Sequence, residues 1–250
     1  MPPPILFSSY VNILILFHEI EKVFLVFFEC LQRNAEYAIV KDKNKYKGFD
    51  MNAKFFDLKK EKQDRMINAA LKVFSLNGYR HASTDDIVQE AEISKGLLFH
   101  YFGSKAGLFA FVYEYSVRYM LLELSTKVSR KESNLFEVMK QIEMARMNAM
   151  KGYPYMQQFL NRCETEEVDE ALLAMENMQK LLKGEYDRIN SQILYADFPA
   201  GVDGHKLQKM MELTIEGLLA EKFRGESFQP EALYAEIAGY MDMMRKLTER

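Results

Sequence analysis

Two short helical patterns in quick succession constrain the fold of this chain more than any other feature. The first covers residues 84–91, the second residues 93–105, and only a tight break separates them. Two short helices joined by such a turn form the frame of a helix-turn-helix, whose second helix can lie in the major groove of DNA. The second segment also carries the hydroxyl, basic and aromatic groups that contacts to phosphates and bases require. The sequence therefore predicts a helix-turn-helix.

A longer helix is expected just before this pair, over residues 59–77. Met66, Ala70 and Phe74 recur there at the spacing that places apolar side chains on one face of an α-helix. Gly78 follows directly, and glycine favours the left-handed conformation that ends many helices. The pattern predicts a first helix that packs against the helix-turn-helix pair.

Small hydroxyl residues mark the expected starts of the following helices. Serine and threonine favour the N-terminal cap because the side-chain oxygen accepts a hydrogen bond from a free backbone N–H. Asp85 and Asp86 would lie in the first turn of the second helix, where negative charge suits the helix dipole. The expected caps are Ser83 or Thr84, then Ser94, then Ser104.

The composition restricts the class of protein. The chain of 250 residues is 48% hydrophobic and carries a net charge of −3, so it is not a polycation that coats nucleic acid. Residues 51–105 hold nine Lys/Arg against seven Asp/Glu, a net +2, and the remainder holds −5. Two cysteines set no disulfide framework and fit a reducing compartment, so we expect a cytoplasmic protein. Six prolines and no alternating strand pattern after residue 51 predict an all-α body.

Residues 1–50 differ from the rest and are treated as an atypical N-terminal extension. Their two apolar runs, 5–17 and 23–28, are each shorter than the roughly 20 residues that span a bilayer. Charged residues separate the runs. A signal peptide is not expected, because the segment has neither a basic start nor a small-residue cleavage site. An anchor that lies in the membrane interface would need a cationic face, which this segment lacks, although membrane attachment remains an alternative. We expect no membrane partner.

A misassigned start, with translation beginning at Met51, is the preferred explanation of this extension. Lys47 and Gly48 must be encoded by a purine-rich stretch that resembles a bacterial ribosome-binding site, and two codons separate them from Met51. An intact-mass measurement that finds Met1 in the native protein would exclude this explanation.

Several spaced motifs carry a resemblance to a known family. They are the runs Ala-Ala-Leu-Lys-Val-Phe at 69–74, Asn-Gly-Tyr at 77–79, Ser-Thr-Asp-Asp-Ile at 83–87, Ile-Ser-Lys-Gly-Leu-Leu-Phe-His-Tyr-Phe at 93–102 and Ser-Lys at 104–105. Over about residues 62–111 the chain resembles the N-terminal domain of the TetR/AcrR family of bacterial transcriptional regulators. It departs from the family at Phe99, where a tyrosine is usual, and at Leu97, where a small or polar residue is common.

The resemblance implies a two-domain, all-α protein. Residues 51–105 would form a three-helix DNA-binding domain, and residues 106–250 a helical domain for effector binding and dimerisation. The implied function is that of a homodimeric transcriptional regulator. It would be a repressor that a small-molecule effector releases from a pseudo-palindromic, double-stranded operator. The resemblance implies neither a cofactor nor a metal.

The expected DNA contacts combine the resemblance with the chemistry of the residues. Hydroxyls and backbone N–H groups at helix N-termini bind phosphates, lysines add positive charge, and a glycine lets the backbone approach the groove closely. A lysine beside a helix N-terminus opposes the dipole, so a purely structural purpose would not favour Lys105. The expected contacts are Thr84, Ser94, Lys95, Gly96, Leu97, His100, Tyr101 and Lys105.

Each of these residues also has a plain structural interpretation. Thr84 and Ser94 can be helix caps alone, and Lys95 can be a solvated lysine. The ring of Tyr101 could be core, but its phenol favours a wet edge of the domain. Leu97 could contact a thymine methyl or simply be exposed.

The C-terminal half predicts five or six helices, with breaks near 131–133, 152–154, 165, 198–201 and 225–227. The last two, about 206–223 and 230–248, have broad apolar faces that can serve both core and dimer interface. The faces consist of Met210, Leu213, Ile215, Leu218 and Leu219, then Leu233, Ile237, Tyr240, Met241 and Met244. Residues suited to line an effector pocket are Tyr113, Met144, Met147, Tyr155, Met156 and Phe159.

Two other functions compete with the effector-controlled repressor. An architectural or partner-controlled DNA-binding protein of the same fold would need no effector, and a pocket filled by side chains would favour it. An enzyme is not expected, because His18, His81, His100 and His205 are scattered and neither a metal-ligand spacing nor a nucleophile motif occurs.

Overall fold

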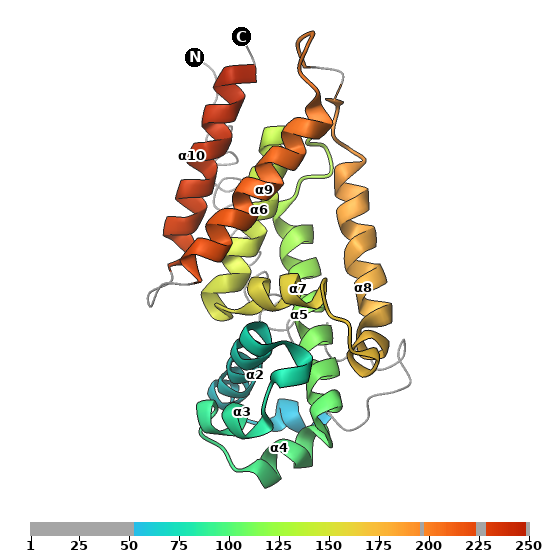
Figure 1. The fold of residues 1–250 in the computed structure, drawn as a ribbon, viewed down its shortest axis with the longest axis vertical. Helices are drawn as coiled ribbons and strands as arrows, with labels where there is room; N and C mark the ends of the chain where they lie inside the picture. The colour runs from blue at the N-terminus through green and yellow to red at the C-terminus, as the bar shows by residue number, and fades with distance from the viewer. Residues whose placement is uncertain (1–52, 196–197, 224–228, 249–250) are drawn as a thin grey trace, which may run out of the picture. The chain divides into compact units, whose positions relative to one another are not determined.

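The described part of the chain, from residue 53 on, has helices as its only regular secondary structure and forms one compact unit. The computed structural model describes residues 53–195, 198–223 and 229–248 (Figure 1). A 3-10 turn, η1 (Ala53–Asp57), precedes α2 (Lys60–His81), α3 (Thr84–Glu90) and α4 (Lys95–Phe102). The all-α prediction is confirmed, because these ranges contain no strand. The predicted extension 1–50, the start at Met51 and the break at 225–227 lie outside the described residues.

The first helix begins where the apolar spacing predicts and breaks at the glycine that follows it. Gly78 has φ 66° and ψ 176°, after which one more turn completes α2 at His81. The positive φ was expected, but ψ is extended and so differs from the left-handed helical region. The backbone therefore changes direction at Gly78, where a residue with a Cβ would be strained.

Serine side chains cap the three helices that follow. Ser83 Oγ accepts from the backbone N–H of Asp85 at 3.1 Å, which decides between the two expected caps in favour of Ser83. Ser94 Oγ accepts from Leu97 N–H at 3.2 Å, and Ser104 Oγ accepts from Gly107 N–H at 3.0 Å. A cap of this kind stabilises a helix by about 1 kcal/mol.

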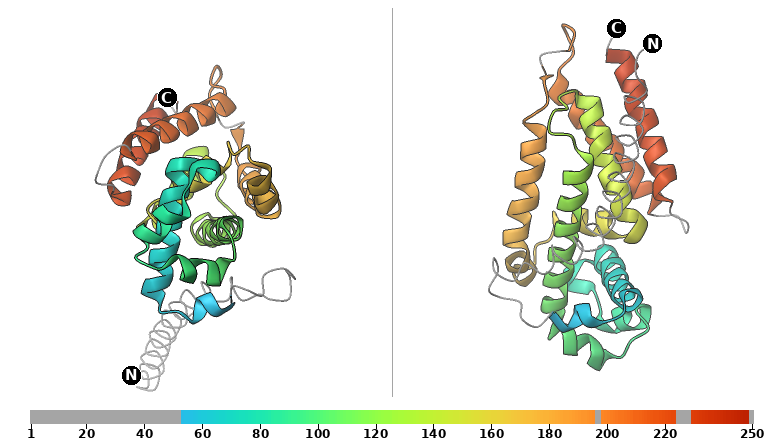
Figure 2. Two further views of the ribbon diagram at one scale, coloured as in Figure 1. Left: turned by 60° about the horizontal axis from the view of Figure 1, so that its bottom comes forward. Right: turned by 180° about the vertical axis from the view of Figure 1, so that it is seen from behind.

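The C-terminal half contains six described helices, as expected. They are α5 (Lys105–Lys127), α6 (Leu135–Gly152), α7 (Met156–Cys163), α8 (Asp169–Asn190), α9 (Gly204–Lys222) and α10 (Pro230–Thr248). In both side views α5 and α6 lie between α8 and α10 (Figures 1 and 2). None of the described helices has the length and apolarity needed to cross a membrane.

Aromatic rings join the first three helices to the rest of the core. Phe109 of α5 meets Phe74 of α2 at 5.0 Å and Phe159 of α7 at 5.6 Å between ring centroids. Phe55 and Phe102 pack against Phe111 of α5 in the same way, with centroids 5.0 Å apart in each pair. Because α5 contributes to both halves, replacing one of these aromatic residues with alanine would lower the free energy of unfolding of the whole unit by about 3–5 kcal/mol. The division at residue 105/106 therefore stays a prediction.

Hydrogen bonds also connect α2 with the C-terminal half. The buried Tyr153 hydroxyl, between α6 and α7, donates to Asp64 Oδ1 at 2.7 Å and lies 2.6 Å from the hydroxyl of Tyr115. At the other end of α2, the Tyr79 N–H donates to Glu166 Oε2 at 3.0 Å. Both ends of α2 are thus fixed to segments of the C-terminal half.

Candidate nucleic-acid interface

The turn between α3 and α4 has the compact geometry of a helix-turn-helix. The Ile93 N–H donates to Val88 O at 3.0 Å, and Glu92 adopts a positive φ of 53°. Arg65 of α2 contacts the Glu92 carboxylate at 3.3 Å. The backbone hydrogen bond and the contact with Arg65 both stabilise the turn, so the direction of α4 relative to α3 is well defined.

One face of α4 is buried and the opposite face is open to solvent. Leu98, Tyr101 and Phe102 are buried, whereas His100 and the first turn are exposed. In Figure 1, α4 lies at the end of the unit opposite to α9 and α10. The helix thus presents its N-terminal turn outward on a rigid base, as a groove-reading helix must.

The first turn of α4 is open around its glycine. A Cβ built on Gly96 would have no other heavy atom within 4 Å, and Ser94, Lys95 and Gly96 are all exposed. No packing reason within the described residues requires glycine here, although glycine costs a helix up to about 1 kcal/mol relative to alanine. The open space suits the close approach of another backbone.

Lys95 has a partner that the sequence analysis missed. Its ammonium group contacts Asp85 Oδ1 at 2.8 Å and Oδ2 at 3.1 Å, across the turn between the two helices. Both side chains are more than half exposed, so the pair stabilises the fold by less than about 1 kcal/mol. A phosphate would therefore compete with Asp85 for Lys95.

Lys105 corrects one argument made from the sequence. A structural role was not expected for it, yet its Nζ lies 4.7 Å from the centre of the Tyr79 ring and donates to Arg80 O at 3.3 Å. Burial lowers the pKa of Lys105, while the nearby carboxylates of Glu170 and Glu166 oppose that shift. Lys105 therefore packs against the end of α2, whether or not it also contacts DNA.

Tyr101 also differs from the expectation of a wet edge. It is only 9% exposed, and its ring contacts Phe55 at 5.8 Å and Phe102 at 6.4 Å. The ring packs because η1 covers that side of α4, which the sequence pattern did not reveal. The neighbouring Leu97 and Phe99 are half-buried, and Thr84 is half-buried in the first turn of α3.

The residues expected to line an effector pocket are spread over different environments. Tyr113, Met147, Met156 and Phe159 are buried, and Phe159 belongs to the aromatic core described above. Tyr155 lines a surface groove of about 540 Å³ between α2 and the α6–α7 connection, which contains none of the other five candidates. Met144 is half-buried on α6. Of these residues, Tyr113 and Phe159 contact each other, with ring centroids 6.3 Å apart, whereas Tyr155 lies in the separate surface groove.

Comparison with known proteins supports the interpretation of this site. Residues 66–112 match the family described as bacterial regulatory proteins, tetR family. The chain is 34% identical over 91 residues to the HTH-type transcriptional regulator BetI of Vibrio vulnificus (strain YJ016), covering 36% of this chain and 42% of that protein. It is 45% identical over 49 residues to the uncharacterized HTH-type transcriptional regulator YuxN of Bacillus subtilis (strain 168), covering 20% and 17%. The match thus spans less than half of either relative.

Residues 66–112 therefore resemble the DNA-binding segment of tetR-family regulators.

Two solved structures of TetR-family regulators share its fold over most of their length. One, from Chloroflexus aurantiacus J-10-FL, aligns with a TM-score of 0.53 at 16% identity and covers 78% of this chain and 96% of its own. The other, PfmR from Thermus thermophilus, has a TM-score of 0.50 at 17% identity and covers 73% and 94%. The matched family and the matched relatives are described as transcriptional regulators rather than as enzymes.

Proposed function

We propose that this chain is a DNA-binding transcriptional regulator whose α4 enters the major groove. The observation that carries the proposal is the open first turn of α4, with Ser94, Lys95 and Gly96 exposed above a buried base. The segment 51–105 also carries the net positive charge of an otherwise acidic chain. Positive charge beside an exposed helix N-terminus suits the phosphate backbone.

The proposed contacts divide into those that position the helix and those that read bases. Thr84 and Ser94 lie at helix N-termini, where hydroxyl and N–H groups bind phosphate without reading sequence. Lys95 and Lys105 add charge, and Gly96 permits close approach. His100 and Leu97 are the candidates for base edges and thymine methyl groups, whereas the buried Tyr101 supports the helix from its inner face.

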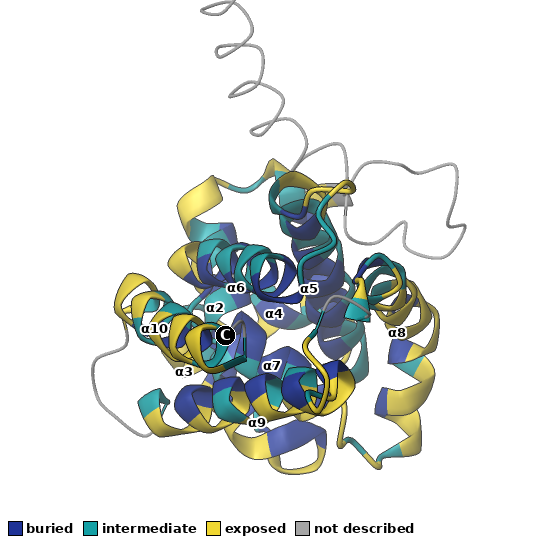
Figure 3. Ribbon diagram, turned by 90° about the horizontal axis from the view of Figure 1, so that it is seen from above, coloured by how far each residue is buried: buried dark blue, intermediate teal, exposed yellow. Residues whose placement is uncertain are grey.

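We propose that the protein acts as a homodimer formed through α9 and α10. Their inner residues are buried, but a set of large apolar residues on the two helices remains exposed (Figure 3). These are Met210, Leu213, Tyr240, Met243 and Leu247. A two-fold dimer would place two copies of α4 about 34–36 Å apart, matching successive major grooves of a pseudo-palindromic operator. Light scattering of wild type and of Leu213→Glu tests this interface, and a wild-type monomer at micromolar concentration would contradict it.

The finer proposal is a cytoplasmic repressor that a small-molecule effector releases from its operator. An effector can shift DNA binding only by its differential affinity for the two states. The alternative is an effector-independent, architectural or partner-controlled regulator. A pocket filled by side chains would favour that alternative. A small molecule that weakens operator binding at least tenfold would favour the repressor.

Mapping bound sites across the source genome tests DNA binding directly. The expected outcome is a set of pseudo-palindromic sites, bound in anisotropy titrations with an affinity that falls steeply with salt. Affinity equal to that for random duplex at every mapped site would contradict the proposal.

A further inference from the structure

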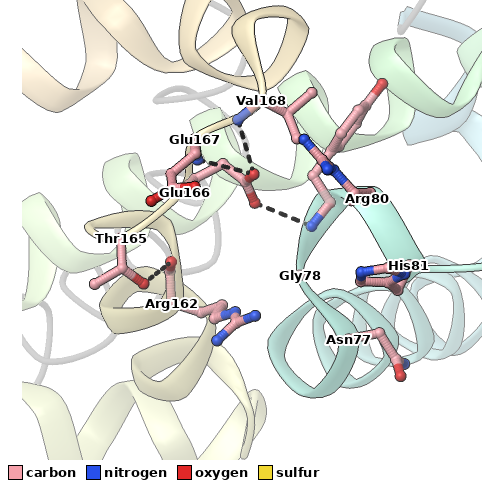
Figure 4. A pocket seen from close by; sticks show the side chains of 10 residues that line it. Asn77, Gly78, Arg80, His81, Arg162, Thr165, Glu166, Glu167 and Val168 are labelled. Atoms are coloured by element: carbon pink, nitrogen blue, oxygen red, sulfur yellow. Dashed lines mark hydrogen bonds between the residues drawn. The ribbon is translucent and has the colours of Figure 1, made fainter.

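A cleft separates the end of α2 from the segment that joins α7 to α8. It has a volume of about 230 Å³. Asn77, Gly78, Arg80 and His81 approach from one side and Arg162 and Glu166 from the other (Figure 4). The cleft thus lies between the helix that supports the helix-turn-helix and the C-terminal half.

Gly78 makes room for the Arg162 guanidinium at this cleft. A Cβ on Gly78 would lie 3.1 Å from Arg162 Nη2 and 3.2 Å from Nε, closer than ordinary van der Waals contact. The positive φ of Gly78 already disfavours other residues. Glycine at this position therefore both turns the chain and lets a planar cation lie against the end of α2.

The acidic side chain beside the cleft is already satisfied by the backbone. Glu166 accepts hydrogen bonds from the N–H groups of Tyr79 at 3.0 Å and of Glu167 and Val168 at 3.1 Å each. Burial tends to raise the pKa of Glu166, but these N–H groups and the positive charge of Arg162 outweigh it, so the pKa lies below its ordinary value. The Glu166 carboxylate thus stabilises the segment that joins α7 to α8 and binds it to the end of α2.

The cations of the cleft are not paired in the same way. Within the described ranges, neither the Arg162 nor the Arg80 guanidinium makes a hydrogen bond or ion pair, and both side chains are exposed. His81 is exposed beside Arg80. Glu167 is the remaining carboxylate at the rim. Two guanidinium groups without hydrogen-bond partners therefore line the cleft, where the charge of Arg162 also acts on the nearby Glu166 carboxylate.

We propose that this cleft binds a small oxyanion, with Arg162 and Arg80 as its principal ligands. Guanidinium groups bind carboxylate and phosphate oxygens through paired N–H donors, which gives such contacts both strength and geometry. The volume is below the roughly 300–1,000 Å³ of typical drug-sized sites. Together with the rim carboxylate, this favours one phosphate or carboxylate group rather than a polyanion.

A bound anion would link the two halves of the chain. Arg80 lies three residues before the cap of α3, whereas Arg162 belongs to α7. Bridging them would fix the end of α2 and so bias the direction of the helix-turn-helix. This regulatory consequence rests on the proposed function. If the anion changes operator affinity by some factor, operator DNA changes anion affinity by the same factor.

Calorimetric titration of the full chain tests the site, with inorganic phosphate and acetate as separate probes in chloride at constant ionic strength. We expect saturable binding of at least one probe, weakened at least tenfold in Arg162→Gln. Arg188→Gln is the matched control, because Arg188 forms an ion pair with Glu185 on α8, away from the cleft. It should bind like the wild type. The preferred probe identifies the class of anion.

Two results would overturn the inference: no saturable binding of either probe, or binding by Arg162→Gln equal to that of the wild type. Anisotropy with mapped operator DNA separates this outcome from the proposed function. If the protein binds DNA but no anion, only the proposed anion site is refuted. If it binds an anion but no DNA, only the proposed regulatory function is refuted. Phosphate or acetate should also change operator affinity in the wild type but not in Arg162→Gln.

Discussion

Replacing Gly96 with alanine should have opposite effects on stability and on DNA binding. Gly96 lies in the first turn of α4, and an added Cβ would meet no atom within 4 Å. Alanine is favoured over glycine in a helix by up to about 1 kcal/mol, so the variant should be more stable by roughly 0.5–1 kcal/mol. In a chain of this size, 1 kcal/mol corresponds to about 2–4 °C in Tm.

The same methyl group should weaken DNA binding, because it occupies the space proposed for the groove wall. A loss of about 1.4 kcal/mol on binding is a tenfold loss of affinity, and we expect at least that much. Anisotropy titration against a mapped operator measures the loss, and calorimetric melting of the same preparation measures the gain in stability.

Gly184→Ala is the matched control for this prediction. Gly184 lies within α8, is exposed and has equally open surroundings, so alanine should stabilise it similarly without changing DNA affinity. If Gly96→Ala binds the operator as tightly as the wild type, the close-approach argument fails. If it melts below the wild type, the surroundings of Gly96 have been misjudged.

Three further substitutions test individual side chains. Asp85→Asn should release Lys95 and tighten DNA binding several-fold, and unchanged affinity at low salt would show that Lys95 is not a contact. Lys105→Ala should weaken binding to all DNA sequences alike and reduce the salt slope by about 1, whereas an unchanged slope would remove it from the interface. The depressed pKa of Glu166 means that its charged form stabilises the fold above its ordinary pKa of about 4.5 and that this contribution is lost in acid. Glu166→Gln should therefore lower the free energy of unfolding by about 1 kcal/mol at pH 7 and by less at pH 4, and an equal deficit at both values would contradict the argument.

The local structure of the helix-turn-helix could be predicted because its signals are short in range. A cap such as Ser94 needs a partner three residues away, and the break at Gly78 needs only the conformational freedom of glycine. The apolar spacing of α2 likewise reports a single helix face. The caps Ser94 and Ser104 and the break at Gly78 follow from these signals, whereas the last turn of α2, to His81, does not.

Contacts between distant segments could not be predicted in this way. Tyr101 has the composition of a wet-edge residue, yet η1 covers it, and Lys105 lies on a ring that precedes it by 26 residues. The pairing of Lys95 with Asp85 depends on the angle of a turn rather than on either helix alone. Each outcome depends on where a second segment packs.

The amino-acid sequence by itself determined that the described part of the chain is helical, that it contains a helix-turn-helix and that the first turn of α4 is polar. Those properties follow from periodicity and from groups only a few residues apart. Only the tertiary structure decided that α5 joins both halves, that Glu166 accepts a hydrogen bond from the end of α2 and that Arg80 and Arg162 line one cleft beside it. These outcomes depend on contacts between distant segments, such as Tyr79 and Glu166, which are 87 residues apart, and no local pattern encodes them.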